Sequence, residues 1–220
     1  MIKVKTLDFL KDLAKNNDRE WFALNKSRHD DARENVLGFA TEIIEGLAKI
    51  DKSIPNDLTA KDCVMRIYRD IRFSLNKTPY KNNFGAGFSP VGKKFDGPGY
   101  YLHISPGECF VAGGCWMPEA PQLKLIRQEI DYNASEFKES LKSLHKSNSK
   151  AQLDSDHKLK TAPKGYPADH PEIEFLRLKS FTVTIPLKPT ELTKPDALAK
   201  VLSGFKSIYP FILFLRNAVS

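Results

Sequence analysis

The residues best suited to bind an anion lie close together, between positions 66 and 81. Five basic residues in this stretch stand against one acidic residue, a formal charge of +4 out of +7 for the whole chain. Guanidinium groups bind phosphate and carboxylate through paired hydrogen bonds, and lysine ammonium groups add point charges. The stretch therefore predicts an anion site, built from Arg66, Arg69, Asp70, Arg72, Lys77, Tyr80 and Lys81.

Two interpretations of this stretch stay open. In the first, Arg66 and Arg72 form a receptor for phosphate or carboxylate, and Asp70 orients a guanidinium or acts as a base. In the second, Asp70 pairs with the arginines and the tyrosines cover their stems, so the residues form an internal network. One carboxylate cannot neutralise five cations, so other carboxylates or an external anion must contribute.

A second group of polar residues lies between positions 17 and 26. Trp21 can stack on a base or sugar while Arg19 and Lys26 contact phosphate, and Glu20 is an alternative catalytic base. The competing interpretation is a helix packed through Trp21 and Phe22 with a solvated polar side.

Three further candidates come later in the chain. Residues 113–114 are glycines whose N–H groups can face an anion ahead of Trp116, although a plain turn explains them equally well. Lys164 and His170 lie in a proline-rich loop, an element that often carries binding residues. His170 is a candidate acid or base, or a histidine that bonds only to backbone.

Several familiar classes of site lack their signatures. The five histidines show no metal-ligand spacing, and there is no P-loop, nucleophile elbow or dinucleotide-binding glycine pattern. Three cysteines without a CxxC pair argue against a disulfide framework and for a reducing compartment. We expect no metal and no cofactor.

Composition and length predict one soluble domain over residues 1–220. Hydrophobic residues make up 41% of the chain and charged residues 28%, which is enough apolar material for a core. Charged residues interrupt the N-terminus where a signal peptide needs an apolar run, and the longest apolar run near the C-terminus is residues 211–215. We therefore expect a cytoplasmic protein without a membrane partner.

The elements that must position these residues change character along the chain. The first 50 residues are expected to be mostly helical, with Thr6 capping the first helix, a second helix opening at Asp18 and a long amphipathic third helix. An antiparallel meander follows over residues 62–115, including a strand at 65–73 and a pair at 100–104 and 109–112 around a Pro-Gly turn. The fold class is therefore α+β, a mostly antiparallel sheet flanked by N- and C-terminal helices.

Later signals complete this outline. Pro118 and Pro121 mark the start of one helix, and Asn133 with Glu136 resembles a capping box for the next. Residues 180–185 are predicted to form a strand, and the rest of the chain is predicted to be helical with a break or start at Pro210.

The motif Arg-x-x-Arg-Asp-x-Arg-Phe, followed by Lys and Tyr, resembles the signature of the bacterial and fungal family called domain of unknown function 2461. The matching residues are Arg66, Arg69, Asp70, Arg72, Phe73, Lys77 and Tyr80. The resemblance extends over nearly the whole chain, through Asn17, Arg19, Glu20, Trp21, Phe22, Asn25, Lys26, Tyr101, Gly113, Gly114, Trp116, Pro118, Pro163, Lys164, Gly165, His170, Pro171, Leu178 and Lys179. It implies no activity, because the family has no agreed catalytic residues.

Three functions follow as hypotheses. The first is a protein that binds a small phosphate-bearing ligand, either as a binding protein or as an enzyme. The second is a non-catalytic nucleic-acid-associated module that uses the same basic residues together with Trp21, Trp116 and the lysines between 138 and 164. The net positive charge of the chain is by itself weak support for this hypothesis. The third is a purely structural arginine–carboxylate network.

Overall fold

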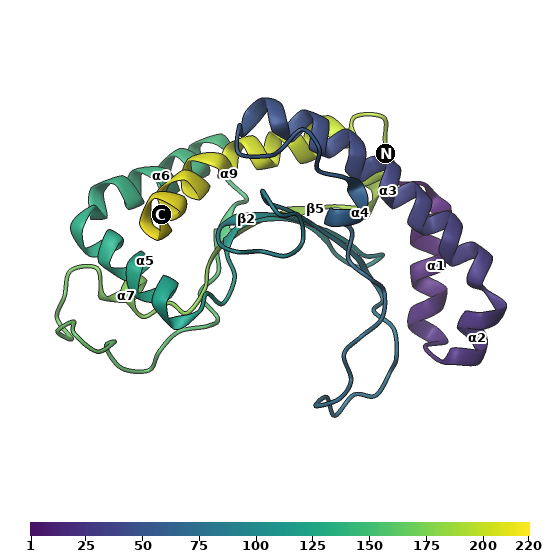
Figure 1. The fold of residues 1–220 in the computed structure, drawn as a ribbon, viewed down its shortest axis with the longest axis horizontal. Helices are drawn as coiled ribbons and strands as arrows, with labels where there is room; N and C mark the ends of the chain where they lie inside the picture. The colour runs from purple at the N-terminus through teal and green to yellow at the C-terminus, as the bar shows by residue number, and fades with distance from the viewer. The chain divides into compact units, whose positions relative to one another are not determined.

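A computed structural model describes residues 1–220 (Figure 1). Their contacts gather them into two compact units. Unit 1 comprises Met1–Lys94, Tyr101–Val111 and Pro186–Ser203. Unit 2 comprises Phe95–Tyr100, Ala112–Ile185 and Gly204–Ser220. The expectation of one domain over the whole chain stays a prediction.

Five strands form an antiparallel sheet in the order β1-β2-β3-β5-β4. Their bounds are Phe84–Phe88 for β1, Gly99–Ile104 for β2, Cys109–Cys115 for β3, Gln152–Leu153 for β4 and Phe181–Leu187 for β5. β1, β2 and β3 are neighbours in chain order, and the predicted pair around the Pro-Gly turn is confirmed. β4 pairs with β5 in the register Gln152↔Thr184 and Leu153↔Val183. The α+β class is thus confirmed.

The helices of unit 1 are α1 (Val4–Lys15), α2 (Arg19–Leu24), α3 (Lys26–Ile50), α4 (Ala60–Cys63) and α8 (Pro189–Leu192). α1 packs on α3, and α3 and α4 pack on β1. Fully buried Phe9, Leu13 and Ile43 form part of this core. The long amphipathic helix predicted from the spacing of apolar residues is confirmed as α3.

The first helix starts differently from the prediction. α1 begins at Val4, so Thr6 lies inside the helix, where it is buried. The Asn35 side-chain oxygen, contributed by α3, accepts hydrogen bonds from the Lys3 backbone N–H at 2.7 Å and from the Thr6 hydroxyl at 2.8 Å. A residue distant in sequence therefore replaces the expected local cap, and the prediction of a Thr6 cap was wrong.

Unit 2 contains α5 (Ala120–Tyr132), α6 (Ala134–Ser147), α7 (Ile173–Leu176) and the part of α9 (Ala197–Val219) that follows residue 203. Pro121 lies in the first turn of α5, as predicted. α6 begins after Asn133, but the Asn133 amide donates to the Glu129 carboxylate at 2.8 Å and caps nothing. The helix start was right and the capping box was wrong.

α9 continues through Pro210, so the predicted break there was wrong. Proline in a helix interior costs about 3 kcal/mol, because it removes one hydrogen bond and crowds the preceding turn. Each fully buried large apolar side chain contributes about 1.5–3 kcal/mol in return. α9 has five of them within unit 2, Phe205, Ile208, Phe211, Ile212 and Leu215, which together outweigh the proline.

By length and composition alone, α9 is apolar enough to cross a membrane. Its side chains are nevertheless packed within unit 2, where the Phe211 ring lies 6.1 Å and the Phe214 ring 5.2 Å from the Phe137 ring, measured between centroids. A core helix of a soluble protein can pass the same test of length and composition.

Gly114 provides a test of how tightly β3 and β5 approach. Its φ of +133° is unfavourable for other residues, and an added Cβ would overlap the Phe181 backbone carbonyl. We expect Gly114→Ala to lower the free energy of unfolding by roughly 2–4 kcal/mol in urea denaturation. Gly107→Ala is the control, since its Cβ would meet nothing within 4 Å. Equal stability of the two variants would contradict this packing.

Candidate functional site

The basic stretch forms an arm, defined here as residues 64–81, that extends away from the sheet (Figure 1). The arm contains no strand, and its β-type pairing is limited to two isolated bridges, Val64↔Ala86 and Tyr68↔Tyr80. The predicted strand over residues 65–73 was therefore wrong. The chain bends at residues 72–73, where the Asp70 carboxylate accepts from the Arg72 backbone N–H at 3.3 Å. This local hydrogen bond competes with strand pairing.

Arg69 holds the two legs of the arm together. Its guanidinium donates to the Thr78 carbonyl at 3.2 Å, to the Thr78 hydroxyl and to the Ser74 hydroxyl at 3.4 Å. All these acceptors are neutral oxygens of the opposite leg or the tip. Arg69 therefore stabilises the arm.

Arg72 and Asp70 form an exposed pair near the tip. Two parallel hydrogen bonds join them, Nε to Oδ1 at 3.0 Å and Nη2 to Oδ2 at 2.7 Å. These bonds hold the pKa of the Asp70 carboxyl below its usual value and raise the pKa of Arg72. A carboxylate with a lowered pKa is a weaker base, so the pairing does not favour the catalytic role predicted for Asp70.

The remaining cations of the arm have different surroundings. The Lys77 ammonium donates to the Ile71 carbonyl at 3.0 Å and closes the tip. Arg66 is exposed and Lys81 is half-buried, and neither has a carboxylate partner. Burial, and then the nearby Arg66 charge, lower the pKa of Lys81.

Asn17 fixes the arm against the N-terminal helices. Its side-chain oxygen accepts from the Tyr80 N–H and its amide donates to the Tyr80 carbonyl, both at 3.0 Å. The Tyr80 ring, only 6% exposed, stacks on Phe22 with centroids 4.0 Å apart and planes 13° apart. Burial raises the pKa of Tyr80, and its ring belongs to the core. Sequence reasoning gave Asn17 no role, because a contact across 63 positions leaves no local signal.

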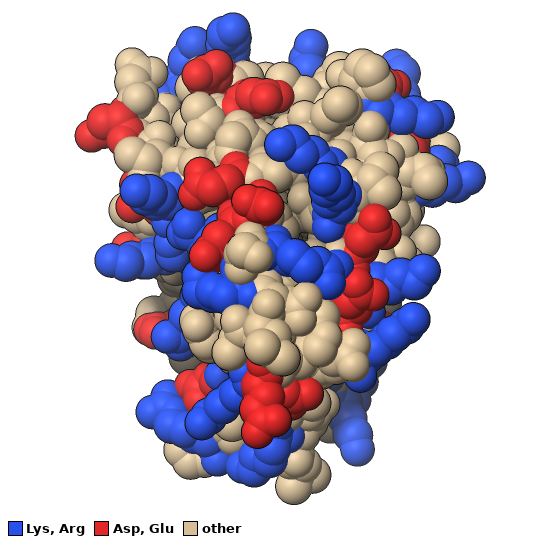
Figure 2. All heavy atoms as spheres, turned by 90° about the vertical axis from the view of Figure 1, so that its right-hand side faces the viewer, with Lys and Arg blue, Asp and Glu red and all other residues tan.

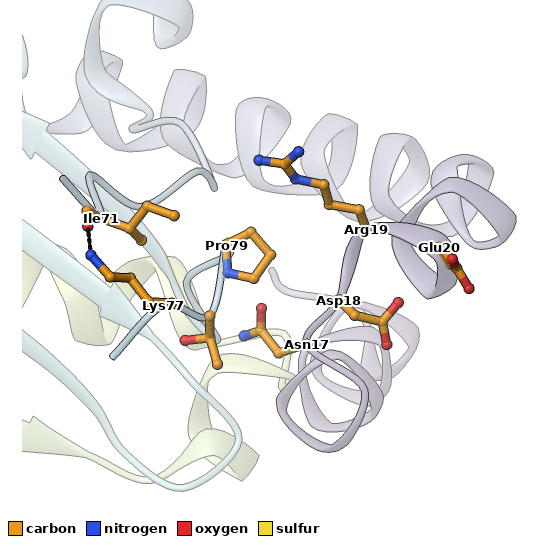
Figure 3. A pocket seen from close by; sticks show the side chains of 8 residues that line it. Asn17, Asp18, Arg19, Glu20, Ile71, Lys77 and Pro79 are labelled. Atoms are coloured by element: carbon orange, nitrogen blue, oxygen red, sulfur yellow. Dashed lines mark hydrogen bonds between the residues drawn. The ribbon is translucent and has the colours of Figure 1, made fainter. Parts of the chain in front are cut away.

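An open hollow of about 670 Å³ lies between the arm and the start of α2 (Figure 3). It is lined by Asn17, Asp18, Arg19, Glu20, Ile71, Lys77, Thr78 and Pro79. The Arg19 side chain extends toward the arm and has no carboxylate partner, whereas the Glu20 carboxylate points away (Figure 3). Asp18 is engaged as the cap of α2, accepting from the Trp21 N–H at 2.8 Å. The charged group of α2 that faces the arm without an ion-pair partner is therefore the Arg19 guanidinium, which is positive.

Trp21 and Lys26 take part in packing among the N-terminal helices. Trp21 is half-buried and stacks on Phe9 at 6.1 Å, with the Arg28 guanidinium 5.9 Å from the indole centroid. Lys26 forms an ion pair with Asp30. These contacts agree with the interpretation of a packed helix with a solvated polar side.

Trp116, Lys164 and His170 belong to unit 2 and do not line the hollow. His170 accepts from the Glu172 N–H at Nδ1, at 3.0 Å, which places its proton on Nε2 for donation to Asp131 at 2.9 Å. Both ring nitrogens are occupied. Trp116 and Lys164 are exposed, and the Trp116 ring meets His157 edge-on at 5.2 Å.

No group of three or more His, Cys, Asp or Glu side chains is arranged to hold a metal ion. The three cysteines are free and buried. Burial raises the pKa of Cys63 to about 12 and of Cys115 to about 11, so both remain protonated thiols at neutral pH.

Fold and arm together define an α+β protein with a basic arm folded against its N-terminal helices. The chain belongs to the family of conserved hypothetical proteins DUF2461, whose family model matches residues 5–214. The match confirms the resemblance seen in the arginine motif and adds no activity. No curated protein and no solved structure matches the chain.

Replacing Asn17 should loosen the arm. Asn17→Ala leaves two backbone groups of the buried Tyr80 without partners, and we expect a loss of about 1–3 kcal/mol in unfolding free energy. Asn82→Ala is the matched control, because Asn82 is exposed and its side chain makes no hydrogen bond. Chemical denaturation followed by circular dichroism measures both. A loss no larger than that of the control would show that the amide does not hold the arm.

His29 should make unit 1 sensitive to mild acid. Its ring lies 5.1 Å from Phe22 and 6.2 Å from Phe84, and this burial lowers its pKa below 6.5, although Asp30 opposes the shift. The unfolded chain then binds the proton more readily than the folded protein. The contribution of neutral His29 to the free energy of unfolding is therefore fully present above about pH 6.5 and is lost as the pH falls toward the lower pKa of the folded state.

We therefore expect the unfolding free energy of the wild type to fall between about pH 7 and about pH 5 more steeply than that of His29→Gln. His145→Gln, at an exposed position of α6, should keep the wild-type slope. Denaturation midpoints across this pH range measure the difference. Parallel curves for the wild type and His29→Gln would refute it.

Proposed function

We propose that unit 1 binds a small phosphate-bearing anion in the hollow between α2 and the arm. The observation that carries the proposal is the Arg19 guanidinium, which extends toward the arm without a carboxylate partner (Figure 3). Lys77 lines the same hollow and uses one of its three N–H groups on the Ile71 carbonyl. Two cations with free donors suit the several oxygens of a phosphate group.

The internal contacts of the arm favour a mixed interpretation of the arginine motif. Arg72 pairs with Asp70, as the structural hypothesis supposes, and Arg69 is engaged within the arm by neutral oxygens. Arg66 and Arg19 are not, so positive charge is left over for an external anion. The ligand site proposed here therefore uses Arg19 and Lys77 in place of the Arg66–Arg72 fork.

The charge distribution favours a local site over a nucleic-acid surface. Figure 2 shows the side of the molecule that carries α1, α2 and α3, where acidic and basic side chains are interspersed. A nucleic-acid module needs a continuous basic stripe along the path of the backbone. On this face a compact anion is the better fit.

The proposal concerns binding and includes no catalytic step. Glu20 points away from the arm, and Asp70 is already paired with Arg72. Neither carboxylate is placed to take a proton from a ligand held by Arg19.

Calorimetric titration with inorganic phosphate and pyrophosphate at low salt tests this function. We expect both to bind the wild type, and Arg19→Gln to weaken binding by about tenfold or more, because one charged hydrogen-bonding group is lost. Arg33→Gln is the control, since Arg33 is a half-exposed arginine of α3 that does not line the hollow.

Addition of salt should weaken binding to the wild type, since the site is open to solvent. The proposal fails if neither anion binds, or if Arg19→Gln and Arg33→Gln bind equally well.

A further inference from the structure

Two large apolar side chains stand in solvent at the tip of the arm, residues 71–77. Phe73 is 96% exposed and Leu75 is 103% exposed, so neither is covered by the rest of the protein. Neither residue lines the hollow beside α2. Single exposed apolar residues are ordinary on a protein surface, but two of them at the end of a projecting element form one convex apolar surface. Removing this surface from water is favourable, so the tip suits an apolar partner.

The polar groups of the tip are engaged inside the arm. The Ile71 carbonyl accepts from the Ser74 backbone N–H at 3.4 Å and from the Lys77 ammonium at 3.0 Å. The Asn76 side-chain oxygen accepts from the Thr78 N–H at 3.0 Å and from its hydroxyl at 2.8 Å. These hydrogen bonds hold the loop in a conformation that leaves its apolar side chains, and not its polar ones, facing outward.

Positive charge lies beside the two apolar side chains. The Arg72 guanidinium is 5.9 Å from the centroid of the Phe73 ring, and its side chain is 76% exposed. Asp70, the only carboxylate of the arm, is already paired with Arg72. Lys77 is exposed and donates to a neutral carbonyl, which leaves its charge uncancelled. The partner of the tip should therefore be negatively charged as well as apolar.

A lipid bilayer with anionic headgroups has both properties. Its surface admits a convex apolar tip to the boundary of the acyl chains, while arginine and lysine side chains stay among the headgroups. A protein partner fits less well, because stable interfaces bury about 1,200–2,000 Å² and two side chains supply only roughly a few hundred. The expectation of no membrane partner concerns segments that span a bilayer, whereas a tip that enters one leaflet needs no such segment.

We propose that the tip of the arm docks on the surface of an anionic membrane. Phe73 and Leu75 enter the boundary between headgroups and acyl chains, and Arg72 lies among the headgroups. This contact goes beyond the binding of phosphate in the hollow and does not depend on it. It requires no motion of the arm, since both apolar side chains already face outward.

Co-sedimentation with lipid vesicles tests the proposal. We expect the wild type to bind phosphatidylcholine vesicles that contain phosphatidylserine, and to bind pure phosphatidylcholine more weakly by roughly fivefold or more. Phe73→Ser and Leu75→Ser should each weaken binding to the anionic vesicles by roughly fivefold or more, because an inserted apolar side chain is lost. Val4→Ser is the matched control, since Val4 is an exposed apolar residue at the start of α1.

A pair of charge variants separates the local charge of the tip from the net charge of the protein. Arg72→Gln and Lys49→Gln each remove one positive charge from an exposed residue, but only Arg72 lies beside Phe73. We expect Arg72→Gln to weaken vesicle binding more than Lys49→Gln does. Phosphate titrations of Phe73→Ser should match those of the wild type, which keeps this test separate from that of the hollow.

A fluorescent label reports insertion directly. The three native cysteines are buried, so Leu75→Cys supplies one accessible thiol for an environment-sensitive dye, and Val4→Cys supplies the control. On addition of anionic vesicles, the emission of the dye at residue 75 should shift to shorter wavelength, and that of the dye at residue 4 should not.

Three results would overturn the proposal. The first is a wild type that binds both kinds of vesicle equally or not at all, and the second is equal binding by Phe73→Ser, Leu75→Ser and Val4→Ser. The third is an unchanged emission at residue 75. Self-association in sedimentation velocity that Phe73→Ser abolishes, without any binding to vesicles, would assign the tip to a contact between two copies of the chain instead.

Discussion

The paired hydrogen bonds between Asn17 and the Tyr80 backbone are the contact on which the candidate site depends. An asparagine amide offers one acceptor and donors in fixed geometry, so it can meet a peptide group as a neighbouring strand would. The arm needs such a partner because a single isolated bridge, Val64↔Ala86, pairs its backbone with the sheet. With Tyr80 also stacked on Phe22, the start of α2 is held beside the arm, and the hollow between them keeps its shape.

Some arginines of the motif have hydrogen-bond partners inside the arm, and others are left without such partners. Arg69 lies between the legs, where three oxygens saturate much of its guanidinium, and Arg72 is paired with the only carboxylate of the stretch. Sequence reasoning correctly concluded that Asp70 could not balance five cations. It could not tell which arginine would turn inward, because that choice depends on how residues 74 and 78 fold back.

The elements that sequence predicted well are those with local signals. Regular spacing of apolar residues revealed α3, Asp18 marked the start of α2, and Pro-Gly separated β2 from β3. The predictions that were wrong concern positions where contacts between residues distant in sequence outweigh the local sequence signal. Asn35 supplies the cap expected from Thr6, and burial keeps α9 continuous through Pro210.

The candidate sites were partly accessible from sequence for the same reason. Arg19 and Lys77 were found because charge is visible in the chain. The contact of the Tyr101 and His103 rings with Phe110 was missed, although Tyr101 and His103 alternate on a strand that was itself predicted. Phe110 comes from β3 and Asn83 from the segment just before β1, so only the pairing of the strands brings the group together.

The positive charge of Arg69 also acts beyond the residues that the guanidinium contacts. Hydroxyl and carbonyl oxygens satisfy its hydrogen bonds without cancelling its charge. The arm thus keeps a standing positive potential that extends into the solvent over a Debye length, about 8–10 Å at physiological ionic strength. Such a potential draws negatively charged molecules from solution and speeds their first encounter with the protein, even when the residue producing it never touches them.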